Sequence, residues 1–193
     1  MKKQSPDLSD AQRLAYLEEH FSYEVREMVY CCWFSVSARQ HKVGVQKDLE
    51  QFLENTALDH FLLHARNLLE FYYEVEKPHM YAHASAFVKG WRPPRRTPQI
   101  NMLRNRVYPE VTHLGWSRLA TPPSDKSWIL ADVAKDLLLT TIQFLDSLDQ
   151  KYKSDFVTVL RVECDNALTT LGQNRAEADA DLFKSLEAAG HLW

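Results

Sequence analysis

Two arginines and a histidine in the middle of the chain have the side chains that acid–base chemistry on a phosphodiester requires. Arg106 and His113 are seven residues apart, so a continuous helix would place them on one face; Arg118 follows five residues later. An imidazole with a pKa of about 6.5 can move the proton of a ribose 2′-hydroxyl, while guanidinium groups hold phosphate and stabilise developing charge. These residues predict RNA cleavage that needs no metal and no cofactor.

The same region is strongly basic in a chain whose net charge is −3. Residues 77–109 contain no Asp or Glu but seven Lys and Arg, a local field suited to a polyanion. Prolines at 93, 94 and 98 indicate a loop over residues 90–98, since proline denies the chain regular hydrogen bonds. The candidate nucleic-acid-binding residues, with the indole as a stacking surface for a base, are Lys89, Trp91, Arg92, Arg95 and Arg96. The alternative is an ordinary solvated loop.

The stretch DHFLLHARNLLEFYYE, residues 59–74, places polar side chains on an otherwise apolar helix. Arg66 and Asn67 are candidate supporting residues for the site. The simpler interpretation pairs Arg66 with Glu70 four residues later and gives Asn67 a polar contact to a neighbouring helix. His60 and His64 are also four apart, a spacing that can chelate a metal, so a metal-binding bundle is a second alternative. Because no carboxylate-rich helix accompanies them, our prediction is no metal and two packed, hydrogen-bonded histidines.

Apolar residues recur at three- and four-residue steps along most of the chain, which predicts helices rather than strands. Ser9 and Gln12 form a capping-box pattern that begins a helix running to about residue 37, with a break near Ser22. Further helices are expected over 45–77, 99–119 and 127–148, and Pro109 forces either a kink or a fresh helix start within the second of these. Two C-terminal helices over 154–190 separate at Gly172. A short helical piece should precede Gly90. The sequence therefore predicts one all-α domain over residues 1–193, a bundle of about five to seven helices.

LLHARNLLEFYY followed by INMLRNRVYPEVTHLGWSRL resembles an uncharacterised family of bacterial all-helical proteins, which has an HARNL helix and a later His-Leu helix ending in Arg. That family in turn resembles the HEPN superfamily. The resemblance covers about residues 57–145 and implies a HEPN-like up-and-down core, a homodimer, and metal-independent endoribonuclease activity of a toxin–antitoxin or phage-defence type, with an antitoxin or other protein partner. Its Arg-polar…His motif matches Arg106 and His113, with Val107 in place of the polar residue and Pro109 inside the motif.

Compartment and partners follow from what the sequence lacks. The N-terminal stretch turns polar after two lysines, and no apolar run approaches the ~18 residues of a membrane span, so we expect a cytoplasmic protein without a membrane partner. Three cysteines, two of them adjacent, indicate reduced thiols. RNA is the expected ligand. The alternative to an RNA-binding enzyme is a non-catalytic helical binding or scaffold module.

Overall fold

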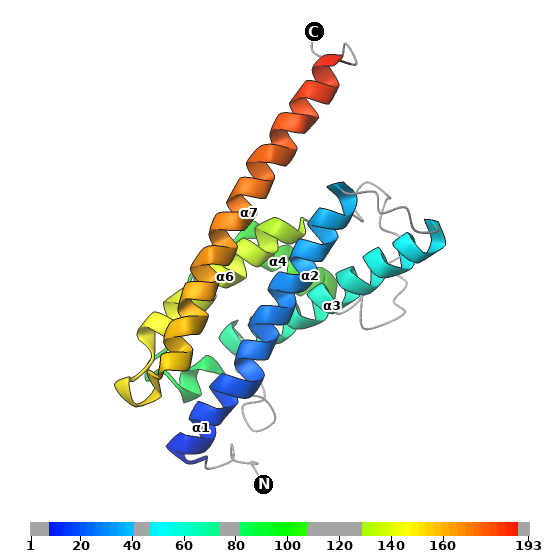
Figure 1. Ribbon diagram of the computed structural model, residues 1–193. Coiled ribbons are helices and arrows are strands. Elements are labelled where there is room, and N and C mark those ends of the chain that lie inside the picture. The colour runs from blue at the N-terminus through cyan, green and yellow to red at the C-terminus, as the bar shows by residue number, and fades with distance from the viewer. Residues whose placement is uncertain (1–7, 41–46, 74–81, 108–128, 189–193) are drawn as a thin grey trace.

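The computed structural model describes residues 8–40, 47–73, 82–107 and 129–188, and it is all-helical in these ranges. The helices are α1 (Asp10–Tyr16), α2 (Ser22–Gln40), α3 (Lys47–Tyr73), α4 (Pro98–Val107), α6 (Leu130–Ser147) and α7 (Asp155–Ala188). Because a π-helical segment joins α1 to α2 without interruption, the described residues form five helices in one domain (Figure 1). The predicted all-α bundle is confirmed at this level. In the described ranges, no helix has the length and apolar character that crossing a membrane requires.

The first helix begins as its sequence predicts. The Ser9 hydroxyl accepts a hydrogen bond from the Gln12 backbone N–H, and the Gln12 side chain accepts one from the Ser9 N–H. The break expected near Ser22 is instead a π-helical turn over Leu17–Phe21, so the helix widens locally but continues. The Ser22 hydroxyl donates to the Glu18 carbonyl at 2.6 Å within this turn. Both ends of the turn, Leu17 and Phe21, are buried.

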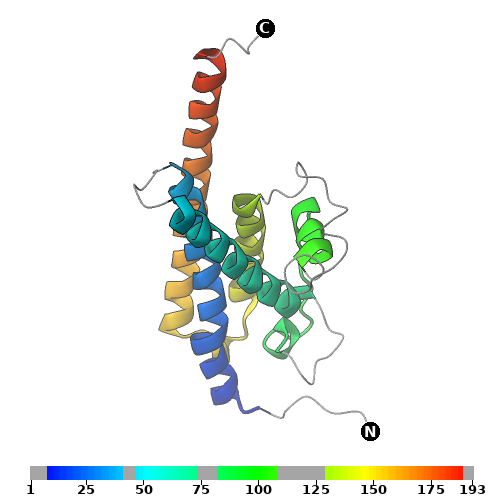
Figure 2. The ribbon, with the colours of Figure 1, turned by 90° about the vertical axis from the view of Figure 1, so that its right-hand side faces the viewer.

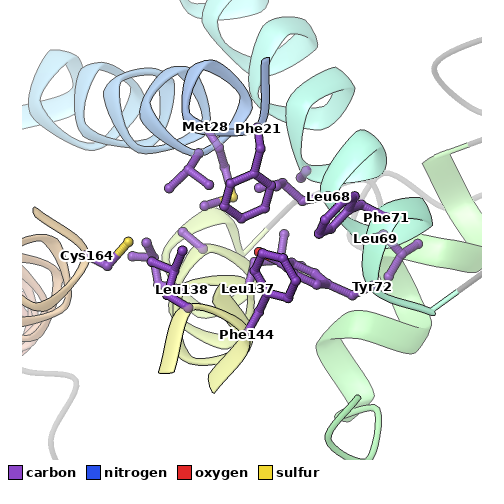
Figure 3. Close-up of a cluster of buried hydrophobic side chains, with 14 of the residues drawn as sticks. Phe21, Met28, Leu68, Leu69, Phe71, Tyr72, Leu137, Leu138, Phe144 and Cys164 are labelled. Carbon is purple, nitrogen blue, oxygen red and sulfur yellow. The ribbon is translucent and has the colours of Figure 1, made fainter. Parts of the chain in front are cut away.

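The core lies where α2, α3 and α6 meet, and aromatic rings fill its centre (Figure 3). Phe71 lies 5.0 Å from Phe21 and 5.1 Å from Phe144 between ring centroids, the latter edge to face. Such pairs contribute about 0.5–1.5 kcal/mol each beyond the apolar area they bury. Tyr72 is fully buried, and its hydroxyl lies 2.8 Å from that of Thr141, so its polar end is satisfied.

The C-terminal part of the chain differs from prediction. Residues 155–188 form one helix of 34 residues, α7, so the expected division at Gly172 is wrong. A glycine within a helix costs only about 0.5–1 kcal/mol relative to alanine, which the flanking helix-forming residues can offset. The first half of α7 packs on α6, and the second half extends beyond the rest of the bundle (Figure 1).

The segment before α4 also differs from prediction. Where a short helical piece was expected, residues 82–97 contain one 3₁₀ turn, Ala84–Ala86, followed by Gly90 at φ 74°. Residues 91–97 then form no regular secondary structure, as the prolines predict. α4 packs on α3 and α6, on the opposite side of the bundle from α7 (Figure 2). This arrangement places the basic loop, residues 90–98, against α3 and α6.

All three cysteines are free thiols. Cys32 and Cys164 are buried, and burial raises the pKa of each to about 12. At neutral pH both are therefore protonated and poorly nucleophilic. They fill space in the core between α2, α6 and α7.

Candidate nucleic-acid interface

Trp91 fixes the start of the basic loop to the core. Its indole N–H donates to the Tyr72 backbone carbonyl at 3.0 Å, and its ring meets that of Phe144 edge to face, 5.6 Å between centroids. Its other ring neighbour is Tyr72 itself, at 6.2 Å. The ring that we expected to stack on a base thus packs on the aromatic core of its own chain. Trp91 therefore positions the loop and is not part of the ligand-binding surface.

The end of the loop is fixed by a threonine and an aspartate. The Thr97 hydroxyl accepts a hydrogen bond from the Ile100 N–H at 3.2 Å, as a residue capping the start of α4 does. The same hydroxyl donates to Asp136 Oδ2 on α6 at 2.5 Å. In the middle of the loop, the Gln143 side chain donates to the Arg92 carbonyl at 3.5 Å. The loop is therefore held along its length by α3 and α6, although it forms no regular secondary structure.

Four basic residues lie on this fixed segment or directly before it, and we refer to them as the loop cations: Lys89, Arg92, Arg95 and Arg96. Lys89, Arg92 and Arg95 are exposed, while Arg96 lies half-buried with its guanidinium 5.2 Å from the centroid of the Tyr73 ring. No carboxylate in the described residues forms an ion pair with any of the four. Their charge is consequently available to an anion.

A small open cavity of about 130 Å³ lies at the base of the loop, against α3 and α6. Its polar lining comes from Tyr73, Arg95, Thr97, Asp136, Thr140 and Gln143. Burial raises the pKa of Tyr73, against the opposing effects of its Thr140 contact and of the Arg96 charge. The phenol is therefore protonated at neutral pH and can donate a hydrogen bond. The cavity combines hydrogen-bond donors, an acceptor carboxylate and an apolar rim; Arg95 lines it, and Arg96 lies over the ring of Tyr73.

Of the predicted catalytic residues, the described part of the chain contains Arg106. It lies in the last turn of α4, about 12 Å along the helix axis from Pro98, and its guanidinium contacts the Met102 sulfur at 3.9 Å. His113 and Arg118 lie outside the described residues. α4 nevertheless connects the basic loop to a predicted catalytic residue, because it begins where the loop ends and carries Arg106 in its last turn.

The polar residues predicted on the α3 helix make the contacts that the simpler interpretation gave them. Arg66 pairs with Glu70 at 2.8 Å, and Asn67 donates to Glu24 Oε2 on α2 at 3.0 Å. The same Glu24 oxygen lies 2.7 Å from Nδ1 of His64, which is buried. Sequence reasoning missed Glu24. Its position three residues after Phe21 and four before Met28, on an otherwise apolar face, was the available signal.

The histidine pair is divided by burial. His64 lies against Glu24, whereas His60 is exposed, and their ring centroids are 6.4 Å apart. Within the described ranges, no group of three or more His, Cys, Asp and Glu side chains could hold a metal ion. The described residues thus give this pair no third ligand. Glu24 instead makes His64 part of a hydrogen-bonded contact between α2 and α3, so the expectation of a packed, hydrogen-bonded histidine holds for His64 and is wrong for His60.

Comparison with known proteins adds no family to these observations. No protein-family model matches the chain, and no curated protein sequence or solved structure matches it either.

Proposed function

We propose that this protein binds single-stranded RNA through its basic loop. The observation that supports the proposal is the set of loop cations, none of which a described carboxylate neutralises, on a segment fixed by Trp91 and Thr97. Positioned cations favour phosphate because each contact releases counterions and little ordering of the loop is required. The open cavity favours a single strand, since only unstacked bases can enter such a site.

We further propose that the protein cleaves the RNA it binds, as a HEPN-like, metal-independent endoribonuclease. In it, His113 is the general acid and base, and Arg106 and Arg118 hold the scissile phosphate. Arg106 is on the helix that starts at the end of the basic loop, so RNA held by the loop cations would extend along α4 toward it. The resemblance in residues 57–145 supports a homodimer in a toxin–antitoxin or phage-defence system, with an antitoxin as partner. Arg66 and Asn67, on α3, are the residues that would support this site.

The binding test uses a fluorescently labelled, U-rich RNA of about twelve nucleotides, in EDTA and low salt, with anisotropy as the readout. Replacing Arg92, Arg95 and Arg96 with Ser should weaken binding at least tenfold and make the slope of log affinity against log salt shallower by about 2. The matched control replaces three paired cations, Arg26, Arg161 and Lys151, with Ser.

This control changes the net charge equally but should leave affinity within about twofold. Equal losses in both triple variants would show that overall charge, not the loop, attracts RNA. Circular dichroism checks that each variant keeps its helical content.

The same samples report cleavage when the RNA is separated by length. Wild type should shorten the RNA in EDTA, while His113→Ala should bind it with unchanged affinity and leave it intact. Cleavage by both proteins would refute the catalytic role of His113. Retention without cleavage by wild type would identify the alternative function, a non-catalytic helical binding module.

A further inference from the structure

An acidic residue lies at the wall of the cavity, near one of the loop cations. Asp136, on α6, lines the cavity together with Arg95 and Gln143. A carboxylate in this position weakens the attraction for phosphate, so a general RNA-binding surface gains nothing from it. Its contact with Thr97 accounts for only one of its two oxygens, Oδ2.

The other oxygen, Oδ1, receives no hydrogen bond from the residues that the structure describes. A carboxylate offers about four lone-pair positions, and Thr97 uses one of them. Thr97 also fixes the carboxylate, because its hydroxyl is itself held by the start of α4. The cavity thus presents a positioned acceptor whose orientation does not depend on a ligand.

We infer that this cavity binds one unpaired guanine base, with Asp136 as the residue that selects it; the inference rests on the proposed binding of single-stranded RNA. Guanine is the base whose Watson–Crick edge has two adjacent donors, the N1–H and the 2-amino group, which a carboxylate accepts together. Adenine presents the acceptor N1 to the same carboxylate. Uracil has one N–H between two carbonyls, and cytosine has one amino group beside an acceptor.

The rest of the cavity complements guanine. Its O6 acceptor, next to N1–H, suits a donor from Arg95 or Gln143, both of which line the cavity. Leu139, 49% exposed, gives the rim an apolar surface for the face of a base. A volume of about 130 Å³ is near the ~150 Å³ of a cavity that holds benzene, so it accepts the six-membered ring that carries the Watson–Crick edge. The five-membered ring and the sugar remain at the open mouth, on the side of Arg95.

The test compares labelled heptaribonucleotides that differ only in the central base. UUUGUUU should bind about tenfold more tightly than UUUAUUU and UUUUUUU, as expected for a paired hydrogen bond to one base. The oligonucleotide with central inosine, which lacks the 2-amino group, should fall between them. All are measured in EDTA at one low salt concentration, with the intact length of each RNA verified afterwards.

Asp136→Asn is the decisive variant. Its carbonyl can still accept from Thr97, but an amide N–H₂ replaces the second oxygen and opposes the donors of guanine. The preference for guanine should fall to within about twofold, while UUUUUUU binds as tightly as before or more tightly, since a negative charge is lost. Thr97→Ala removes the capping hydroxyl but keeps the carboxylate, so it should retain a preference for guanine.

Each outcome decides one point. If wild type binds all the heptamers alike, the guanine inference is wrong and the proposed function stands. If none binds at low salt, the proposed function fails and the inference fails with it. A guanine preference that Asp136→Asn preserves would overturn the role of Asp136. Should Asp136→Asn fail to fold, the series of bases on wild type still tests the cavity.

Discussion

Two sides of this bundle contain arginines beside a cavity, and the two sets of arginines differ in whether a carboxylate pairs with them. On the α2–α7 side, Arg26 makes two hydrogen bonds to Glu163, at 2.8 and 3.1 Å, beside a cavity of about 240 Å³ lined mainly by Val, Leu and aromatic residues. Arg161, which lies on α7 like Glu163, contacts Asp146 and Asp165. On the opposite side, the loop cations have no described carboxylate as partner. One surface is internally neutralised, and the other is not.

The difference follows from where the chain places its acids. Residues 77–109 have no Asp or Glu, so the basic loop can meet a carboxylate only through another element, and Asp136 is the one that lines its cavity. α7 instead carries acids within a turn of its arginine. An arginine near a carboxylate contributes a little to stability, while one without such a partner costs slight repulsion and remains open to a ligand.

The largest expected effect concerns Trp91, which attaches the basic loop to the core. Trp91→Ala should lower the free energy of unfolding by about 3 kcal/mol, because a large ring in contact with Phe144 and Tyr72 is removed. Urea denaturation measures this change. Trp91→Phe should cost only about 1 kcal/mol, since the ring packing survives and the hydrogen bond to the Tyr72 carbonyl is lost. A near-neutral Trp91→Ala would mean that the loop is not held by the core.

A smaller effect separates the paired from the unpaired cations directly. Arg26→Gln should lower the free energy of unfolding by about 0.5–1 kcal/mol, because side chains that are 32% and 44% exposed form a pair largely screened by water. Arg95→Gln, the matched change on the loop, should leave stability unchanged or slightly raised. Urea denaturation at low salt and at 1 M salt should show the difference shrinking as charge is screened. Equal losses in the two variants would contradict the comparison.

The smallest effect is a pH dependence at another paired group, where Asp10 contacts Lys151 and Tyr152. Hydrogen bonds from Lys151 and Tyr152 hold the pKa of Asp10 below its usual value. Because this pKa is lower in the folded state, the contribution of Asp10 to stability is complete above about pH 4 and is lost as the pH falls through the folded pKa. Asp10→Asn should reduce the loss of stability between pH 5 and acidic pH, as followed by thermal unfolding. An unchanged pH profile would show that the exposed contact has no measurable effect.

Much of the local structure could be predicted from the sequence because it depends on near neighbours. The Ser9 capping box, the Arg66–Glu70 pair and the irregular, proline-rich loop are set by residues within four positions of one another. The apolar face of α3 was likewise predictable from its spacing, and Phe61, Leu62 and Tyr72 are buried on it.

The contacts that build the candidate site could not be predicted in this way. Asp136 reaches Thr97 across 39 positions, and Glu24 reaches Asn67 across 43, so each depends on how helices pack. Trp91 was expected to face a ligand because its neighbours are basic, but the aromatic core beneath the loop determined its place. Gly172 was given too much weight as a helix end, since one glycine does not outweigh the residues around it.

The π-helical turn at Leu17–Phe21 changes the direction in which the side chains of α1 point relative to those of α2. N-terminal to it, Asp10 accepts from the Tyr152 hydroxyl and Arg13 donates to the Ala86 carbonyl. C-terminal to it, Arg26 meets α7. The extra residue in the turn offsets these two sets of contacts by about 100° relative to a regular helix. The continuous helix formed by α1 and α2 can therefore contact Ala86 and Tyr152 near its N-terminus and Glu163 of α7 further along.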